Sequence, residues 1–98
     1  MATFVTLLKW TDQGIRNVRD TAKRAANFRT MVAKAGGSVK DIYWTVGRYD
    51  VVATFEVPDD ETATALMLGI GSLGNVRSET LRAFGEEDMK RIVSKLPS

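Results

Sequence analysis

The residues best suited to chemistry in this 98-residue sequence are those of the segment Gly47-Arg48-Tyr49-Asp50. Glycine permits positive φ at a tight turn, and a carboxylate that follows it can accept backbone N–H bonds there. We favour this turn architecture, which needs no ligand. In the alternative, the Tyr49 hydroxyl donates or accepts a hydrogen bond, and Asp50 is a base or polar anchor at the mouth of a pocket.

Aromatic residues within strand-like segments form a second group of candidates. Trp10, Tyr43 and Trp44 stand in such segments, and aromatic residues there usually belong to a core or an interface. Those that face a partner subunit could instead line a cavity. We therefore retain Trp10 and Tyr43 as candidate ligand-binding residues beside Tyr49 and Asp50.

Acid–base catalysis would have to proceed without histidine, because the sequence contains none. A base that works near neutral pH would then be a carboxylate with a raised pKa or a lysine with a lowered one. Asp50 and Asp12 are the candidate bases, and Tyr49 and Arg16 are the candidates for stabilising negative charge. Asp12 and Arg16 therefore join the candidate site residues, and no catalytic residue is assigned.

The composition excludes several other chemistries. The absence of both cysteine and histidine rules out disulfides, thiolate nucleophiles, Cys/His zinc sites, Ser-His-Asp triads and histidine-ligated haem. The acidic run Asp59-Asp60-Glu61 could hold a hard cation, but acids at the start of a helix usually serve its N-terminus. We therefore expect no metal and no cofactor.

The glycines of Gly69-Ile70-Gly71-Ser72-Leu73-Gly74 match the G-x-G-x-x-G pattern of dinucleotide sites. A true dinucleotide site follows a strand and opens a helix, so that backbone N–H groups face the pyrophosphate. Here the glycines come at the end of a helical pattern and before a strand-like one. They predict the end of a helix, with Gly74 just beyond it.

The charges are distributed unevenly around a formal net charge of +2. Residues 1–49 carry nine basic and three acidic side chains, whereas residues 50–98 carry five basic and nine acidic ones. This asymmetry favours contact between two copies, or packing of a basic element near an acidic one, over binding of nucleic acid. The first expected helix has six bases, Arg24 among them, and we expect them on a solvated face because no stacking aromatic residues are interleaved with them. The sequence has no apolar run long enough for a membrane helix and no basic segment typical of a signal peptide. We expect a cytoplasmic protein without a membrane partner.

Hydrophobic periodicity predicts one domain, residues 1–98, with the order βαββαβ and a further short helix. A long helix with Ile15, Val18, Ala22, Ala25, Phe28, Val32 and Ala35 on its buried side follows the first strand. In the second strand, Val39 and Tyr43 are expected on one side and Ile42, Trp44 and Val46 on the other. The expected strands are 3–10, 38–46, 50–57 and 75–84, and the expected helices begin at Thr11 or Asp12, at Asp59 and at Glu86.

This order is typical of the ferredoxin-like α+β fold, a four-stranded antiparallel sheet with two helices on one face. The other face has no predicted cover, yet the strands carry apolar residues on both sides. Exposed apolar faces usually mark interfaces, so we expect a homodimer that pairs through the sheet. The short C-terminal helix could close one end of the sheet, and its position is not determined by the pattern.

Four parts of the sequence carry a resemblance to a known family: Thr11 to Asn17, Tyr43-Trp44-Thr45 ahead of Gly47 to Asp50, Pro58 to Glu61, and Gly71 to Arg77 with Glu79-Thr80. On these residues the sequence resembles the GYD domain family, small bacterial and archaeal proteins with a ferredoxin-like fold and no settled function. The resemblance covers nearly the whole chain. Arg48 separates the glycine from the Tyr-Asp pair of the family's name, so a role of that tripeptide transfers only to Gly47, Tyr49 and Asp50.

More distantly, the sequence is similar to the ligand-binding domain of feast/famine amino-acid regulators and to dimeric α/β-barrel proteins. The similarity implies dimers or larger even-numbered oligomers with small molecules near subunit contacts. It does not imply DNA binding, because no segment remains for a helix-turn-helix.

Two functions are compatible with these observations. The first is an oligomeric module that binds a small metabolite or a partner at a subunit interface. The alternative is a cofactor-independent enzyme, an isomerase or monooxygenase of the dimeric α/β-barrel type.

Overall fold

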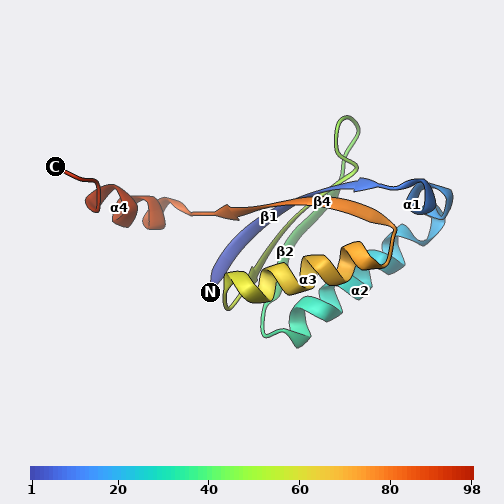
Figure 1. The fold of residues 1–98 in the computed structure, drawn as a ribbon, viewed down its shortest axis with the longest axis horizontal. Helices are drawn as coiled ribbons and strands as arrows, with labels where there is room; N and C mark the ends of the chain where they lie inside the picture. Colours follow the sequence, from blue (N-terminus) through green and yellow to red (C-terminus); the bar gives the residue numbers. More distant parts are fainter.

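A computed structural model describes residues 1–98 as one antiparallel sheet with helices packed on it (Figure 1). The strand order is β2-β3-β1-β4, and the predicted ferredoxin-like α+β fold is confirmed. None of the helices is long and apolar enough to cross a membrane. The elements are β1 (Ala2–Trp10), α1 (Asp12–Arg16), the 3-10 turn η1 (Val18–Asp20), α2 (Thr21–Lys34), β2 (Ser38–Trp44), β3 (Val51–Val57), α3 (Asp60–Ser72), β4 (Val76–Ala83) and α4 (Glu86–Ser94).

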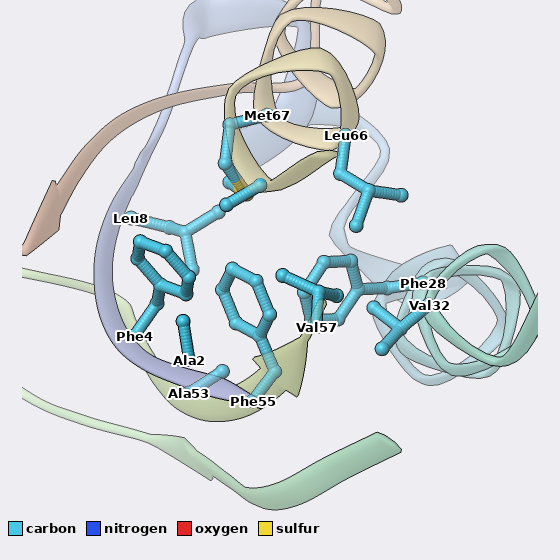
Figure 2. Packing of buried hydrophobic residues seen from close by; sticks show 11 residues of the cluster. Ala2, Phe4, Leu8, Phe28, Val32, Ala53, Phe55, Val57, Leu66 and Met67 are labelled. Carbon is cyan, nitrogen blue, oxygen red and sulfur yellow. The ribbon is translucent and has the colours of Figure 1, made fainter. Parts of the chain in front are cut away.

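The core lies between the central strands and the helices α2 and α3 (Figure 2). The rings of Phe4 and Phe55 stack at 5.5 Å between their centroids, and Phe28 of α2 meets Phe55 edge to face at 5.6 Å. Both distances lie in the range in which aromatic pairs add stability beyond the area that they bury. One polar residue, Thr6, is fully buried among them, and its hydroxyl is 3.0 Å from that of Thr80 on β4.

The long helix expected after β1 is broken near Asn17, and this part of the prediction is wrong. Asn17 ends α1 in a non-helical conformation, and η1 separates it from α2. The Arg24 guanidinium donates to the carbonyl oxygens of Gly14 and Asn17, at 3.2 and 3.3 Å. These bonds satisfy carbonyls that the missing helical turn would have used. As a result, Ile15 is 48% exposed and Ala22 is exposed.

The second strand also departs from simple alternation. The pairing of β2 with β3 shifts between Val39 and Asp41, so Lys40 is an extra residue, and the alternation of side chains between the two faces is reversed beyond it. Val39 and Ile42 therefore both pack against the core. The expectation that Val39 shares a face with Tyr43 is wrong. The strand ends at Trp44, and Val46 is fully exposed beyond it.

The sheet face turned away from α2 and α3 carries a continuous group of apolar side chains, which we call the open face. Val5 and Leu7 of β1 and Val52 of β3 are half-buried there. Tyr43 on one edge strand and Leu81 on the other are 62% and 52% exposed. The register places Val5 opposite Leu81, Leu7 opposite Val52 and Tyr43 opposite Val52, so these side chains adjoin across all four strands.

The third helix begins with a side-chain cap. The Asp59 carboxylate accepts hydrogen bonds from the hydroxyl and the backbone N–H of Thr62, at 2.7 and 2.8 Å. Both bonds favour the charged form, the hydroxyl bond most, and they hold the pKa of Asp59 below its ordinary value of 3.8. The acids at this position therefore cap α3, in agreement with their expected role.

The predicted C-terminal helix forms as α4, but it does not close an end of the sheet. It continues past the end of β4 and extends away from the sheet and from α2 and α3 (Figure 1). The chain consequently measures 53 Å along its longest axis and 19 Å along its shortest. None of the residues of α4 is buried.

Candidate functional site

A cavity of about 100 Å³ lies between the sheet and α2, at the end of the sheet where β1 and β2 finish. Its walls are mainly apolar, and Trp10 and Trp44, the chain's two tryptophans, are both part of them. Concave, apolar sites with a few polar groups are typical of small-molecule binding. The lining residues are Leu8, Trp10, Thr21, Arg24, Ala25, Asn27, Phe28, Met31, Ile42, Trp44, Val51, Ala53, Ile70, Leu73, Asn75 and Val76.

The fold brings the walls together from both layers. Trp10 is the last residue of β1, and Trp44 is the last residue of β2. Phe28 comes from the buried side of α2 and Ile70 from the last turns of α3. The indole N–H of Trp44 donates to the hydroxyl of Thr21 at 2.8 Å, which fixes the orientation of this ring against the start of α2.

Polar groups of the cavity wall come from α2 and from the loop before β4. Arg24 uses two of its side-chain nitrogens on the carbonyls that end α1, and a guanidinium has five N–H donors in all. Asn27 also lines the cavity, as does Asn75. No Asp, Glu or His is among the lining residues, so the wall offers hydrogen-bond donors and a positive charge but no carboxylate.

Asp50 holds Trp10 in place through the backbone. Its carboxylate accepts the N–H of Trp10 at 2.9 Å, and its own N–H donates to the carbonyl of Leu8, also at 2.9 Å. The tight turn before it contains Gly47 at φ 140°, in the region that favours glycine. The Thr45 hydroxyl and N–H complete the turn with bonds to the carbonyls of residues 49 and 50. Asp50 thus accepts a backbone N–H, as the turn interpretation expects.

The two tyrosines lie on the opposite side of the sheet from the cavity. The Tyr49 hydroxyl donates to the Glu79 carboxylate at 3.2 Å, and the Lys9 ammonium and the Arg48 guanidinium each lie 5.7 Å from the centre of its ring. Glu79 pairs with Leu7 on the open face, so Tyr49 reaches across that face. Figure 1 shows the loop between β2 and β3 rising on the side of the sheet away from α2 and α3. Tyr43 is on the same face.

The structure therefore divides the six candidate residues among three places. Trp10 lines the cavity and Asp50 supports it, whereas Tyr43 and Tyr49 belong to the open face. The remaining two, Asp12 and Arg16, are exposed on α1, and their side chains make no hydrogen bond or ion pair within the chain. The six do not form one site.

The segment that follows β1 and the loop that precedes β4 meet at the end of the cavity. We call this contact the α1–β4 junction. The N–H of Thr11 donates to the carbonyl of Asn75 at 3.0 Å, and the Thr11 hydroxyl donates to the carbonyl of Gly74 at 2.5 Å. The Gln13 amide donates to the Asn75 side-chain oxygen at 2.9 Å. A Cβ on Gly14 would lie 1.9 Å from the Asn75 carbonyl oxygen, so this contact requires glycine.

The glycine pattern at 69–74 belongs to a helix end and not to a dinucleotide site. Gly69 and Gly71 lie within α3, and Gly74 follows the end of that helix with φ 85°. The N–H of Gly74 donates to the Gly71 carbonyl at 3.1 Å. The predicted helix termination is confirmed.

Sequence patterns do not reveal several of the lining residues. The charge pattern places Arg24 on a solvated basic face, and strand periodicity places Asn75 at the start of a strand. Helical spacing predicts Phe28 in the core, where it is indeed buried. Residue type marks Trp44 only as a core or interface aromatic. The distance between α2 and the ends of the strands creates the cavity between them, and no local pattern encodes that distance.

Comparison with known proteins agrees with this architecture. A family model described as the GYD domain matches residues 4–93. The crystal structure of TTHA0845 from Thermus thermophilus superposes with a TM-score of 0.55 at 29% identity, over 87% of this chain and 95% of that one. A hypothetical protein, PHS023 from Pyrococcus horikoshii, gives a TM-score of 0.56 at 18% identity over 88% and 93% of the two chains.

A third similar structure is that of MtbAldR, with a TM-score of 0.67 at 13% identity. The match covers 87% of this chain but 52% of MtbAldR, so the chain spans about half the length of that protein. At this identity the likeness shows the fold. Among curated proteins, none resembles the chain closely enough in sequence to count as a relative.

Removing the Asp50 carboxylate should weaken the end of β1. In Asp50→Ala the partly buried N–H of Trp10 loses its acceptor, and we expect the free energy of unfolding to fall by about 1–3 kcal/mol. Asp50→Asn keeps an acceptor oxygen and should lose less. Urea unfolding followed by tryptophan emission measures both, since Trp10 is one of two emitters. Equal stability of the wild type and Asp50→Ala would contradict this role.

A pair of glycine substitutions tests the α1–β4 junction. Gly14→Ala should destabilise the protein by about 1–3 kcal/mol, because the added Cβ collides with backbone at Asn75. Gly71→Ala is the matched control, since its Cβ meets no atom within 4 Å, and higher helix propensity should stabilise it by up to about 1 kcal/mol. In thermal unfolding, the midpoint temperature should fall for Gly14→Ala and rise for Gly71→Ala. A Gly14→Ala variant that is more stable than the wild type would contradict the close approach of Gly14 to the backbone of Asn75.

Proposed function

The chain belongs to the GYD domain family, and from that premise we propose that it is a homo-oligomeric domain that binds a small molecule in the cavity between Trp10 and Trp44. The observation that carries the proposal is the cavity itself. Twelve of its 16 lining residues are hydrophobic. The cavity opens to solvent, so these apolar side chains stay in contact with water unless a ligand covers them. Burial of this surface against the apolar part of a small molecule would favour binding.

The lining chemistry limits what the ligand can be. Its apolar part would lie among Trp10, Phe28 and Trp44, and its polar part would reach Arg24 and Asn27 on α2. Because the wall has a guanidinium and no carboxylate, we expect a hydrogen-bond acceptor or an anion at that end. A cavity of about 150 Å³ holds benzene and this one is smaller, so the ligand is compact. A small branched carboxylic acid fits this description.

Binding is better supported than catalysis. The Asp50 carboxylate accepts a backbone N–H and the Tyr49 hydroxyl donates to Glu79. Neither residue lines the cavity, and the cavity wall contains no acid or histidine. General acid–base catalysis needs a titratable group within hydrogen-bond reach of the substrate, and none lines this cavity.

The open face supports the oligomeric part of the proposal. Its apolar side chains span the sheet from Tyr43 on β2 to Leu81 on β4, which are 62% and 52% exposed. Contiguous apolar surface of this kind usually marks an interface. A second copy presents the same surface, so a two-fold axis through the open face would bury both at once.

Ligand binding can be followed by the protein's own fluorescence. Both tryptophans line the cavity, so titration with 3-methylbutanoate should change the tryptophan emission and saturate. The amine 3-methylbutan-1-amine has the same carbon skeleton and the opposite charge, and it should bind more weakly because Arg24 repels it.

Ala25→Leu provides the second control, because a larger side chain at this lining position occupies the cavity from a helix without backbone strain. The variant should keep the fold and lose the response. A response that survives in Ala25→Leu, or no saturable response with either acids or aromatic probes such as phenol, would contradict the cavity as the binding site.

The open face is tested by a charge placed at its edge. Leu81→Glu should lower the native mass measured by light scattering, because a buried unpaired carboxylate opposes pairing of two apolar faces. Ala33→Glu places the same charge on the exposed side of α2 and should leave the mass unchanged. A wild-type protein that is monomeric, or a Leu81→Glu variant with the wild-type mass, would refute pairing through this face.

A further inference from the structure

The C-terminal helix presents an apolar stripe that nothing in its own chain covers. Met89, Ile92, Val93 and Leu96 recur at helical spacing and are 45%, 37%, 54% and 66% exposed. Isolated helices shorter than about 12 residues are marginal in water, so a nine-residue helix depends on packing for its stability. α4 therefore needs a surface against which to pack.

The start of α4 directs it away from its own domain. The N-cap residue Gly85 is extended, with φ −77° and ψ 177°. The Asp88 carboxylate accepts the N–H of Gly85 at 3.0 Å and also pairs with Arg91. These contacts fix the first turn, and Figure 1 shows α4 projecting from the end of β4, clear of α2 and α3.

A groove on the same chain runs along α3. It lies between α3 and β4 and has a volume of about 660 Å³. Five of its 13 lining residues are hydrophobic (Phe4, Ala63, Met67, Leu68 and Val76), and the others are polar, charged or glycine. Leu68 is 70% exposed. At 1.5 Å per residue, α3 with its 13 residues is about 20 Å long and α4 with its 9 residues is about 14 Å long. The groove beside α3 can therefore hold the whole of α4.

The charges at the ends of the groove and of α4 are complementary. Arg77, at the end of the groove near the last turn of α3, has no ion pair in the chain, and Asp60 lies at the other end, beside Arg82. α4 begins with acids, of which Glu86 has no ion pair, and Lys95 follows its last turn. With α4 antiparallel to α3, Glu86 approaches Arg77 and Lys95 approaches Asp60, and the two helix dipoles are also opposed.

We propose that α4 of one copy packs its apolar stripe into the α3–β4 groove of a second copy. The occupant is a second copy because the chain itself supplies a groove along α3 with an exposed leucine, Leu68, and with end charges that complement those of α4. This contact is separate from the open face and from the Trp10–Trp44 cavity, so its test does not depend on either.

Disulfide trapping tests the contact directly, because the natural sequence has no cysteine. Full-length Ile92→Cys and Leu68→Cys chains, one of them carrying a mass tag, are mixed and oxidised. We expect a covalent heterodimer by mass spectrometry. Ser94→Cys is the matched control: it is nearly isosteric and lies on the opposite side of α4 from the stripe, so it should link to Leu68→Cys several-fold less.

Charge reversal tests the direction of docking. Arg77→Glu in the Leu68→Cys chain should reduce the heterodimer yield, and Glu86→Arg in the Ile92→Cys chain should restore it. A heterodimer yield restored by Glu86→Arg would support the antiparallel arrangement. If Arg77→Glu lowered the yield only by damaging the groove, Glu86→Arg would not restore it. A yield insensitive to both changes would overturn this arrangement.

Other occupants give different products. If α4 folded back onto its own groove, the double variant Leu68→Cys/Ile92→Cys would form an internal disulfide and the mixed chains would not link. If α4 packed against α4, Ile92→Cys chains would link to each other in higher yield than to Leu68→Cys chains. Either result would overturn the proposal, and neither would affect the fluorescence response of the cavity.

Discussion

The hydrogen bond from the Trp10 N–H to the Asp50 carboxylate determines how this end of the sheet is built. β3 begins only at Val51, so the last residues of β1 extend past the point where their partner strand starts. Asp50 replaces the missing ladder bond with its side chain, and Gly47 allows the turn that brings it there. The Trp10 indole then stands as a wall of the cavity. The Gly-x-Tyr-Asp turn thus acts on the cavity through the backbone of β1.

The sheet separates two kinds of surface. On one side, α2 and α3 cover the core and leave the cavity at one end. On the other side, no helix of the chain covers the open face. The α1–β4 junction adds a third element, because it ties the first crossover to the loop that leads into β4. The two halves of the domain are therefore joined at the same end of the sheet that holds the cavity.

Much of the fold could be predicted because β1 and β3 alternate strictly. Phe4, Thr6 and Leu8 face the core and Val5 and Leu7 face the other side, as a period of two requires. The errors occur where a tertiary contact outweighs the local pattern. Arg24 stabilises the break at Asn17 through bonds to carbonyls of α1, and the extra residue Lys40 reverses the alternation of β2.

The candidate site was less predictable for the same reason. Residue type selects Trp10 and Asp50 as candidates, but their contact joins residues that are 40 positions apart in the sequence. The close approach of Gly14 to the backbone of Asn75 is likewise invisible to any local pattern. A glycine in a short helix can equally mark the end of that helix or a neutral exposed position.

The buried pair of hydroxyls, Thr6 and Thr80, has a consequence for the edge of the sheet. A slip of β4 by one residue would turn Thr80 to the open face and leave the Thr6 hydroxyl buried without a partner. The pair therefore opposes a slip of this outer strand by one residue. Since α4 follows β4 after two residues, a threonine in the core also sets how far the C-terminal helix reaches beyond the domain.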